Sequence, residues 1–105
     1  MDILFICGSA QPGKDGVGDY TRQLCVNVIK SGHKAQILSL CDKQVIAFTI
    51  ENQNVDDTSV IVNRIPITTN NKNRLIWVQE ILKNFEPDWI SLQFAPYSFN
   101  PKGLP

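Results

Sequence analysis

One stretch of the sequence decides the fold: Ile3-Leu4-Phe5-Ile6-Cys7-Gly8-Ser9-Ala10-Gln11-Pro12-Gly13-Lys14-Asp15-Gly16-Val17-Gly18. Residues 3–7 form a continuous apolar run that ends at Gly8, a pattern typical of a central parallel strand buried on both faces. Loop-forming residues follow. After them, residues recur at helical spacing and predict a helix whose core-facing side consists of Val17, Tyr20, Thr21, Leu24 and Val28. Strand, glycine-rich loop and helix in this order indicate the start of an open α/β sheet.

The rest of the chain supplies further elements of such a sheet. The first helix is predicted to end at Ser31-Gly32. Three further strands are predicted, at residues 35–40, at 59–65 and, buried, at 88–94. A second helix is predicted from the capping residues 70–73 to Glu86-Pro87. Residues 41–58 are ambiguous between an edge strand and a long loop, because 45–50 have strand composition whereas 52–57 are polar and turn-forming. We expect an α/β fold, a three-layer Rossmann-like sandwich with a mostly parallel sheet, in one domain spanning residues 1–105.

The composition excludes several classes of function. Ten Lys and Arg balance ten Asp and Glu, without a basic stripe, so nucleic-acid binding is disfavoured. The opening apolar run is too short to span a membrane, and Asp2 replaces the positive region of a signal peptide, so a cytoplasmic protein is expected. The three widely spaced cysteines, Cys7, Cys25 and Cys41, are predicted to be reduced core thiols and not a disulfide set or a zinc site. No metal or cofactor is expected.

The glycine-rich loop carries the most specific signal. Its glycines at 13, 16 and 18 read G-x-x-G-x-G, which matches neither the dinucleotide fingerprint nor a P-loop. A run of eleven residues there closely resembles the start of glycosyltransferase family 4 and related GT-B enzymes: Pro12-Gly13-Lys14-Asp15-Gly16-Val17-Gly18-Asp19-Tyr20-Thr21-Arg22, followed by Ser31-Gly32-His33. A later run is similar to the fourth-strand region of the same N-terminal domain: Pro87-Asp88-Trp89-Ile90-Ser91-Leu92-Gln93-Phe94, continuing through Pro96-Tyr97-Ser98-Phe99 to Pro101-Lys102-Gly103.

This resemblance implies both a function and a set of site residues. In that family two Rossmann-like domains face each other, the C-terminal one holding most of a nucleotide-diphosphate sugar and the N-terminal one mainly the hydroxyl acceptor. The implied site residues are Gly16, Val17, Gly18 and Asp19 on the donor-diphosphate side and Gln93, Phe94 and Tyr97 on the acceptor side. The chain is then the acceptor-side domain of a retaining transferase, inactive alone because the C-terminal donor-binding domain is missing. No catalytic residue is identified, and the histidine that many members place near the acceptor does not occur here.

For several of these residues a purely structural role is an alternative to ligand binding. The glycines can simply make a tight turn between strand and helix, and Asp19 can serve the helix N-terminus as a capping group. Tyr20 has a core-facing spacing and is expected to pack. Gln93 can hydrogen-bond to loop backbone, and His33, which follows the helix-ending glycine, is expected to face solvent and not to act as a base.

Three other functions remain open. A stand-alone module of the same fold would hold a phosphate-bearing small molecule without catalysis. A flavodoxin-like or nicotinamide-binding enzyme would need an acidic ribose-binding residue at the end of the second strand, near Asp42. A non-catalytic interaction domain would form a homodimer through the face that a missing domain would otherwise cover.

Overall fold

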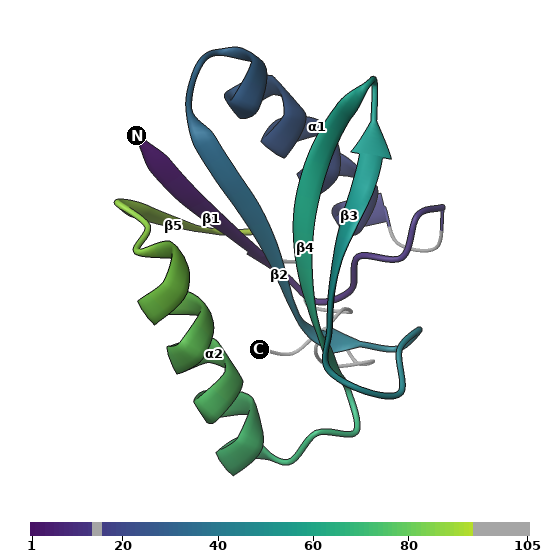
Figure 1. Ribbon diagram of the computed structural model, residues 1–105. Helices are drawn as coiled ribbons and strands as arrows, with labels where there is room; N and C mark the ends of the chain where they lie inside the picture. The colour runs from purple at the N-terminus through teal and green to yellow at the C-terminus, as the bar shows by residue number, and fades with distance from the viewer. Residues whose placement is uncertain (14–15, 94–105) are drawn as a thin grey trace.

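Five strands form one mixed, mostly parallel sheet, against which two helices pack (Figure 1). The computed structural model describes residues 1–13 and 16–93. In chain order the elements are β1 (Asp2–Cys7), α1 (Gly16–Lys30), β2 (Lys34–Asp42), β3 (Thr49–Val55), β4 (Thr58–Pro66), α2 (Asn71–Phe85) and β5 (Trp89–Leu92). The sheet order is β3-β4-β2-β1-β5, in which only β3 runs antiparallel to its neighbour. The predicted α/β class and mostly parallel sheet are confirmed.

Each helix packs against its own side of the sheet. In Figure 1, α1 lies behind the strands and α2 in front of them. Successive side chains of a strand point to opposite faces, and neighbouring residues of β1 and β2 accordingly enter two separate core clusters. Phe5 and Ile37 pack with residues of α1, whereas Leu4 and Leu38 pack with residues of α2. The buried strands are therefore apolar on both faces, as the continuous apolar runs predicted.

The buried side of α1 agrees with the predicted one except at Tyr20, since Thr21 is fully buried and Val17, Leu24 and Val28 pack against the α1-side core. Tyr20 is 63% exposed, so its expected packing role is wrong, whereas Thr21, Cys25 and Val26 are fully buried. The rotation of the helix about its axis is set at its first turns, where Gly18 lies against the loop after β1 and buried Arg22 reaches back to it. These polar and backbone contacts turn Tyr20 toward solvent.

The limits of α2 follow from local capping and agree with the prediction. The Asn70 side chain accepts a hydrogen bond from the Asn73 amide (2.8 Å), which satisfies one of the free donors of the first turn. The helix stops at Glu86, which has a left-handed backbone (φ 52°) and donates its N–H to the Leu82 carbonyl. Neither α1 nor α2, the two helices within the described residues, is long and apolar enough to cross a membrane.

The ambiguous segment 41–58 contains an antiparallel edge strand. Its strand begins later than the composition suggested, because residues 45–48 are irregular and the polar residues from Thr49 onward pair with β4. Asp56 and Asp57 both have positive φ (50° and 61°), as the tight turns of two-residue hairpins require. Backbone pairing with β4 thus outweighs the weak strand propensity of this polar sequence.

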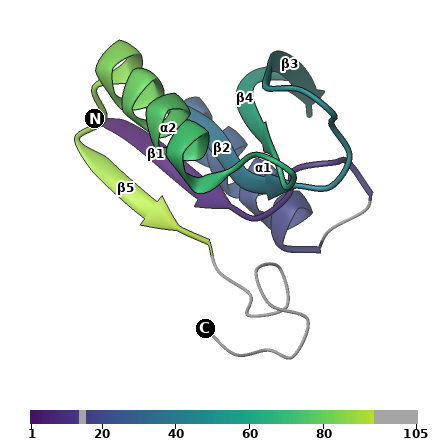
Figure 2. The ribbon, with the colours of Figure 1, turned by 90° about the horizontal axis from the view of Figure 1, so that it is seen from below.

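The last strand is not buried, in contrast to the prediction. Trp89, Ile90 and Leu92 are 61%, 53% and 60% exposed. Figure 2 shows the reason: β5 forms one edge of the sheet, and the two helices lie beside the other strands. The apolar composition of β5 correctly predicts a strand that pairs within the sheet. It does not indicate whether that strand lies at the centre of the sheet or at its edge.

The core holds two of the three cysteines, as predicted. Cys7 and Cys25 are fully buried, whereas Cys41, near the end of β2, is partly exposed. Burial raises the pKa of the Cys25 thiol from 9.0 to about 12, so this group stays protonated at neutral pH. The prediction of a core thiol is therefore not met by Cys41, which lies at the rim of the sheet.

We expect an aromatic disulfide reagent at neutral pH to modify Cys41 well before the two buried thiols, because attack requires an accessible thiolate. Absorbance of the released thiolate should rise rapidly for a single thiol, and the remaining two should react only after denaturation. The variant Cys41→Ser should lack the rapid phase. A rapid phase that survives in this variant would contradict the burial of Cys7 and Cys25.

Candidate functional site

The glycine-rich loop lies at the point where the sheet reverses its strand order. From β1 the chain passes through α1 to β2 on one side, and through α2 it later returns to β5 on the other side of β1. Ligands of open α/β sheets bind outside the carboxyl ends of the strands at such a point. The Gln93 amide donates to the Ile6 carbonyl (2.7 Å), which puts the end of β5 directly beside the end of β1. Two parts of the predicted site, the loop and Gln93, thus share one edge.

The carboxylate of Asp42 anchors this loop from the end of β2. It is fully buried and accepts a hydrogen bond from the Ala10 amide (3.1 Å). It also accepts from the Ser39 hydroxyl (2.9 Å) and the Gln44 amide (3.0 Å). The carboxylate therefore ties the loop after β1 to the loop after β2.

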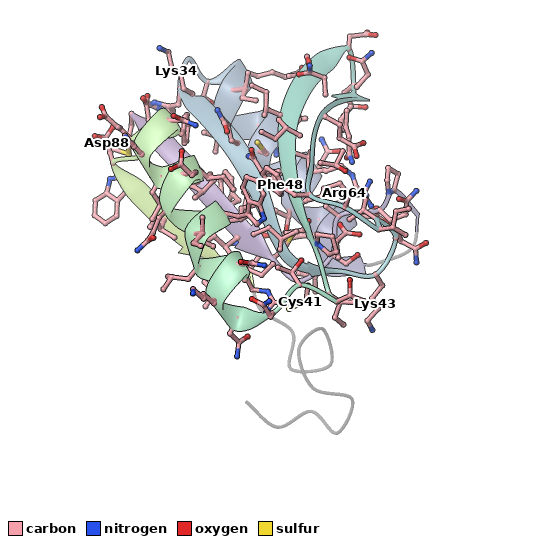
Figure 3. The ribbon with its side chains drawn as sticks, turned by 60° about the horizontal axis from the view of Figure 1, so that its bottom comes forward. Lys34, Cys41, Lys43, Phe48, Arg64 and Asp88 are labelled. Atoms are coloured by element: carbon pink, nitrogen blue, oxygen red, sulfur yellow. The ribbon has the colours of Figure 1, made fainter. Side chains whose placement is uncertain are left out.

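Arg64, on β4, completes the anchor. Its guanidinium is bidentate on Asp42, with Nε 2.9 Å from one oxygen and Nη2 3.0 Å from the other. The same group donates to Glu51 of β3 (2.9 Å) and to the Gln11 side chain (2.8 Å). Figure 3 brings this edge of the sheet forward and labels Arg64, with Cys41 and Lys43 marking the end of β2. We call Asp42, Arg64, Glu51 and Gln11 the Asp42–Arg64 cluster.

A second set of contacts holds the next peptide group of the same loop, between Ala10 and Gln11. The Ala10 carbonyl accepts from Arg22 of α1 (2.7 Å) and from Gln53 of β3 (3.2 Å). Arg22 is also paired with Asp19, whose carboxylate accepts the Gly13 amide (3.1 Å). Ala10, Gln11 and Gly13 of the loop are thus held by side chains from three strands and one helix.

The structure requires glycine at two of the three positions of the motif, for a different reason at each. A Cβ on Gly18 would lie 2.5 Å from the Ser9 carbonyl oxygen, so only glycine lets α1 approach the loop this closely. Gly13 has φ +74°, a backbone that other residues rarely adopt. Gly16 has open space around its Cβ position and is exposed. Of the three, Gly16 is the glycine that neither packing nor backbone geometry requires.

The cluster lowers the pKa of the Asp42 carboxyl. Burial by itself raises this pKa, but the hydrogen bonds from Arg64, from the Gln44 and Ala10 amides and from Ser39 together hold it below the ordinary value of 3.8. Asp42 is therefore ionised at neutral pH. Because its two oxygens already accept hydrogen bonds from these groups, the carboxylate does not present a free edge to a ribose, as the nicotinamide alternative would need.

The remaining predicted site residues occupy different positions. Val17 is half-buried against the α1-side core, and Asp19 is exposed next to the loop. The half-buried Gln93 donates its side-chain amide to Ser91 (2.9 Å). Phe94 and Tyr97 lie outside the described residues. Within residues 1–13 and 16–93, no group of three or more His, Cys, Asp or Glu side chains could hold a metal ion.

The Asp42–Arg64 cluster and Arg22 were not predicted from the sequence. A signal existed: Arg64 lies between Val60-Ile61-Val62 and Ile65 in a strand rich in β-branched residues, where a charged side chain is buried only with a partner. Asp42, directly after another apolar strand, is the natural partner because parallel strands end at the same edge. The ion pair of Arg22 with Asp19 follows from their spacing on a helix, whereas its bond to the Ala10 carbonyl has no sequence signal because the acceptor is backbone.

Comparison with known proteins does not add to this description. No protein-family model matches the sequence, and no curated protein or solved structure matches it at a significant level. The function proposed below therefore depends on the geometry of the chain and on the resemblance of its glycine-rich loop and fourth-strand region.

Gly18→Ala should destabilise the fold by about 1–3 kcal/mol, because the new Cβ meets backbone that cannot move without shifting α1 or the loop. Urea unfolding followed by circular dichroism measures the difference. Gly16→Ala is the matched control: its Cβ has free space, and alanine is the better helix former, so its stability should be unchanged or slightly higher. Equal losses in both variants would refute the close approach at Gly18.

Arg64→Met should lower the unfolding free energy at pH 7 by about 3–5 kcal/mol, because it leaves the buried Asp42 carboxylate without its main partner. Adding Asp42→Asn should recover part of this loss, since the uncompensated charge is then removed. Denaturant unfolding of the single and double variants gives the coupling free energy.

Acid provides an independent check on the same pair. A carboxyl whose pKa is lowered on folding stabilises the protein above its unfolded pKa and loses that contribution as the pH falls through the lowered, folded value. The chain should therefore lose stability below about pH 4, the ordinary range of an aspartate. Asp42→Asn should flatten this part of the profile, and an unchanged profile would argue against the ionised pair.

Proposed function

We propose that this chain is the N-terminal, acceptor-side domain of a retaining glycosyltransferase that moves a sugar from a nucleotide-diphosphate donor to a hydroxyl acceptor. The proposal includes a three-layer, Rossmann-like arrangement, which is supported by the packing of α1 and α2 with separate core clusters. It also includes a cytoplasmic setting, supported by three cysteines that are all free. A second domain would supply the remaining donor contacts, so the chain alone is expected to be inactive.

The observation that carries the proposal is the position of the glycine-rich loop. It follows β1 at the reversal of strand order, beside Gln93 at the end of β5. This is the edge at which phosphate-bearing ligands of α/β proteins bind, and the loop leads directly into the N-terminus of α1. A donor diphosphate against residues 16–18 and an acceptor hydroxyl against Gln93 would then lie on one edge.

The rigidity of the loop supports a role in holding charge. Hydrogen bonds fix Ala10 at both its N–H and its carbonyl oxygen, which belong to two successive peptide groups, and Gly18 fixes α1 against Ser9. These bonds occupy the Ala10 N–H itself, and their contribution is to hold the start of α1 in place. Dipoles that are already oriented at a helix N-terminus stabilise the charge developing on a leaving group without a cost of reorganisation. The Asp19 carboxylate, which accepts the Gly13 amide, is paired with Arg22, and this pairing offsets its repulsion of a phosphate.

A stand-alone phosphate-binding module is the second candidate. It is favoured by the hydrogen bonds that hold Ala10 and Gln11, because they fix this part of the loop against the sheet edge before any ligand binds. The two candidates differ in what they bind alone: the transferase domain needs a nucleoside diphosphate, and the module needs only the phosphate.

Titration with UDP and GDP, followed by amide NMR of the whole chain, should shift the resonances of Gly13 and of residues 16–19. Saturation is expected at a concentration on the order of millimolar, as for half of a two-domain site. Uridine without phosphate should leave these resonances unchanged. A response of equal size to inorganic phosphate would favour the stand-alone module. A loop that stays silent in an intact fold would overturn the proposed donor contact.

A further inference from the structure

A hollow lies on the α2 side of the sheet, away from the glycine-rich loop. α2 packs with Leu4, Leu38 and Ile65 of β1, β2 and β4, and it leaves Ile61 of β4 and Ile50 of β3 partly exposed beside it. The hollow between α2 and these strands has a volume of about 350 Å³, within the range of small-molecule sites. A second hollow of about 440 Å³ shares Gln36, Ile61, Asn84 and Phe85 with it, so the two form one groove beside α2.

The wall of the hollow is aromatic and aliphatic. Phe48 and Trp77 stack with ring centroids 4.3 Å apart and planes 14° from parallel, and Figure 3 shows Phe48 close to α2. Trp77 is 37% exposed, and Ile50 and Ile61 beside it on the strands are 60% and 37% exposed. Such a surface offers flat apolar faces to a ring-shaped ligand.

The lining of the hollow includes a side-chain amide, that of Asn63, with unused hydrogen-bonding capacity. Asn63 is 3% exposed, and its Nδ2 donates to the Gln36 side chain (3.2 Å) and to the Ile37 carbonyl (3.0 Å). Its Oδ1 accepts from no group that the structure describes, and the Gln36 Nε2 likewise has no described acceptor. An acceptor and a donor thus lie next to each other, and a ligand hydroxyl, which both donates and accepts, satisfies such a pair.

The rim of the hollow adds polar groups of a particular kind. Glu80 and Asn84 are four residues apart on α2 and therefore share one helix side. Glu80 is the only charged side chain among those that line the hollow, and no lysine or arginine lines it. A phosphate or carboxylate ligand would meet repulsion there, whereas neutral hydroxyl groups would find amide and carboxylate acceptors.

We propose that this hollow binds a neutral saccharide ring, with its C–H face on the Phe48–Trp77 pair and its hydroxyls on Asn63, Gln36 and Glu80. The adjoining hollow gives room for the sugar to continue as an oligosaccharide along α2. This site does not rest on the proposed function, because it shares no residue with the glycine-rich loop or the Asp42–Arg64 cluster.

NMR titration of the whole chain with the methyl glycosides of glucose, galactose, mannose and N-acetylglucosamine tests the site. At least one of them should shift the Trp77 indole and the Asn63 and Gln36 side-chain amides, with saturation on the order of millimolar. Trp77→Ala and Glu80→Ala should each weaken this binding about tenfold or more. Leu75→Ala and Gln79→Ala, exposed changes on the same helix outside the hollow, should leave it unchanged and report on helix stability.

Four results would overturn the proposal. The first is no saturable shift with any of the four glycosides while the fold is intact. The second is a shift confined to the glycine-rich loop, which would concern the proposed function instead. The third is unchanged binding in Trp77→Ala and Glu80→Ala. The fourth is a shift of the same resonances with protein concentration and not with glycoside, which would identify a second copy of the chain as the occupant.

Discussion

The buried ion pair between Asp42 and Arg64 is the interaction on which this edge of the molecule depends. It joins the ends of β2 and β4, reaches β3 through Glu51, and holds the loop after β1 through Ala10 and Gln11. Removing two charges from water is costly, and the pair tolerates that cost because almost every oxygen and N–H of it has a partner. The result is an edge whose geometry is specified by directional bonds more than by apolar packing.

The placement of α1 is a consequence of the same loop. The helix begins where the loop ends, and its rotation is fixed by Gly18 against Ser9 and by Arg22 on the Ala10 carbonyl. The apolar residues of the helix then occupy the sheet side that this rotation allows. A glycine-rich strand-to-helix turn can therefore be required by packing even where it also faces a ligand, and glycine spacing alone does not distinguish the two roles.

The sequence was informative where structure is determined locally and less so where it depends on distant contacts. The caps of α2, the left-handed Gly32 and the apolar runs of β1 and β2 are local signals, and the structure agrees with them. The outward direction of Tyr20, the pairing of polar β3 and the exposure of β5 depend on the rest of the fold. At the candidate site, the loop and its position could be read from the sequence. The side chains that hold it could not, because they come from strands far apart in the chain.

The edge position of β5 has a consequence for how the molecule assembles and opens. Its contact with β1 joins residues as far as 86 positions apart, whereas β3 and β4 meet across a two-residue turn. Closing the longer segment costs more chain entropy, and β5 has little buried apolar surface to offset it. We therefore expect the hairpin to form early, and β5 to join the sheet last and to exchange its amide protons first. Opening of β5 would uncover the edge of β1 beside the glycine-rich loop and couple the local stability of a short strand to the integrity of the site.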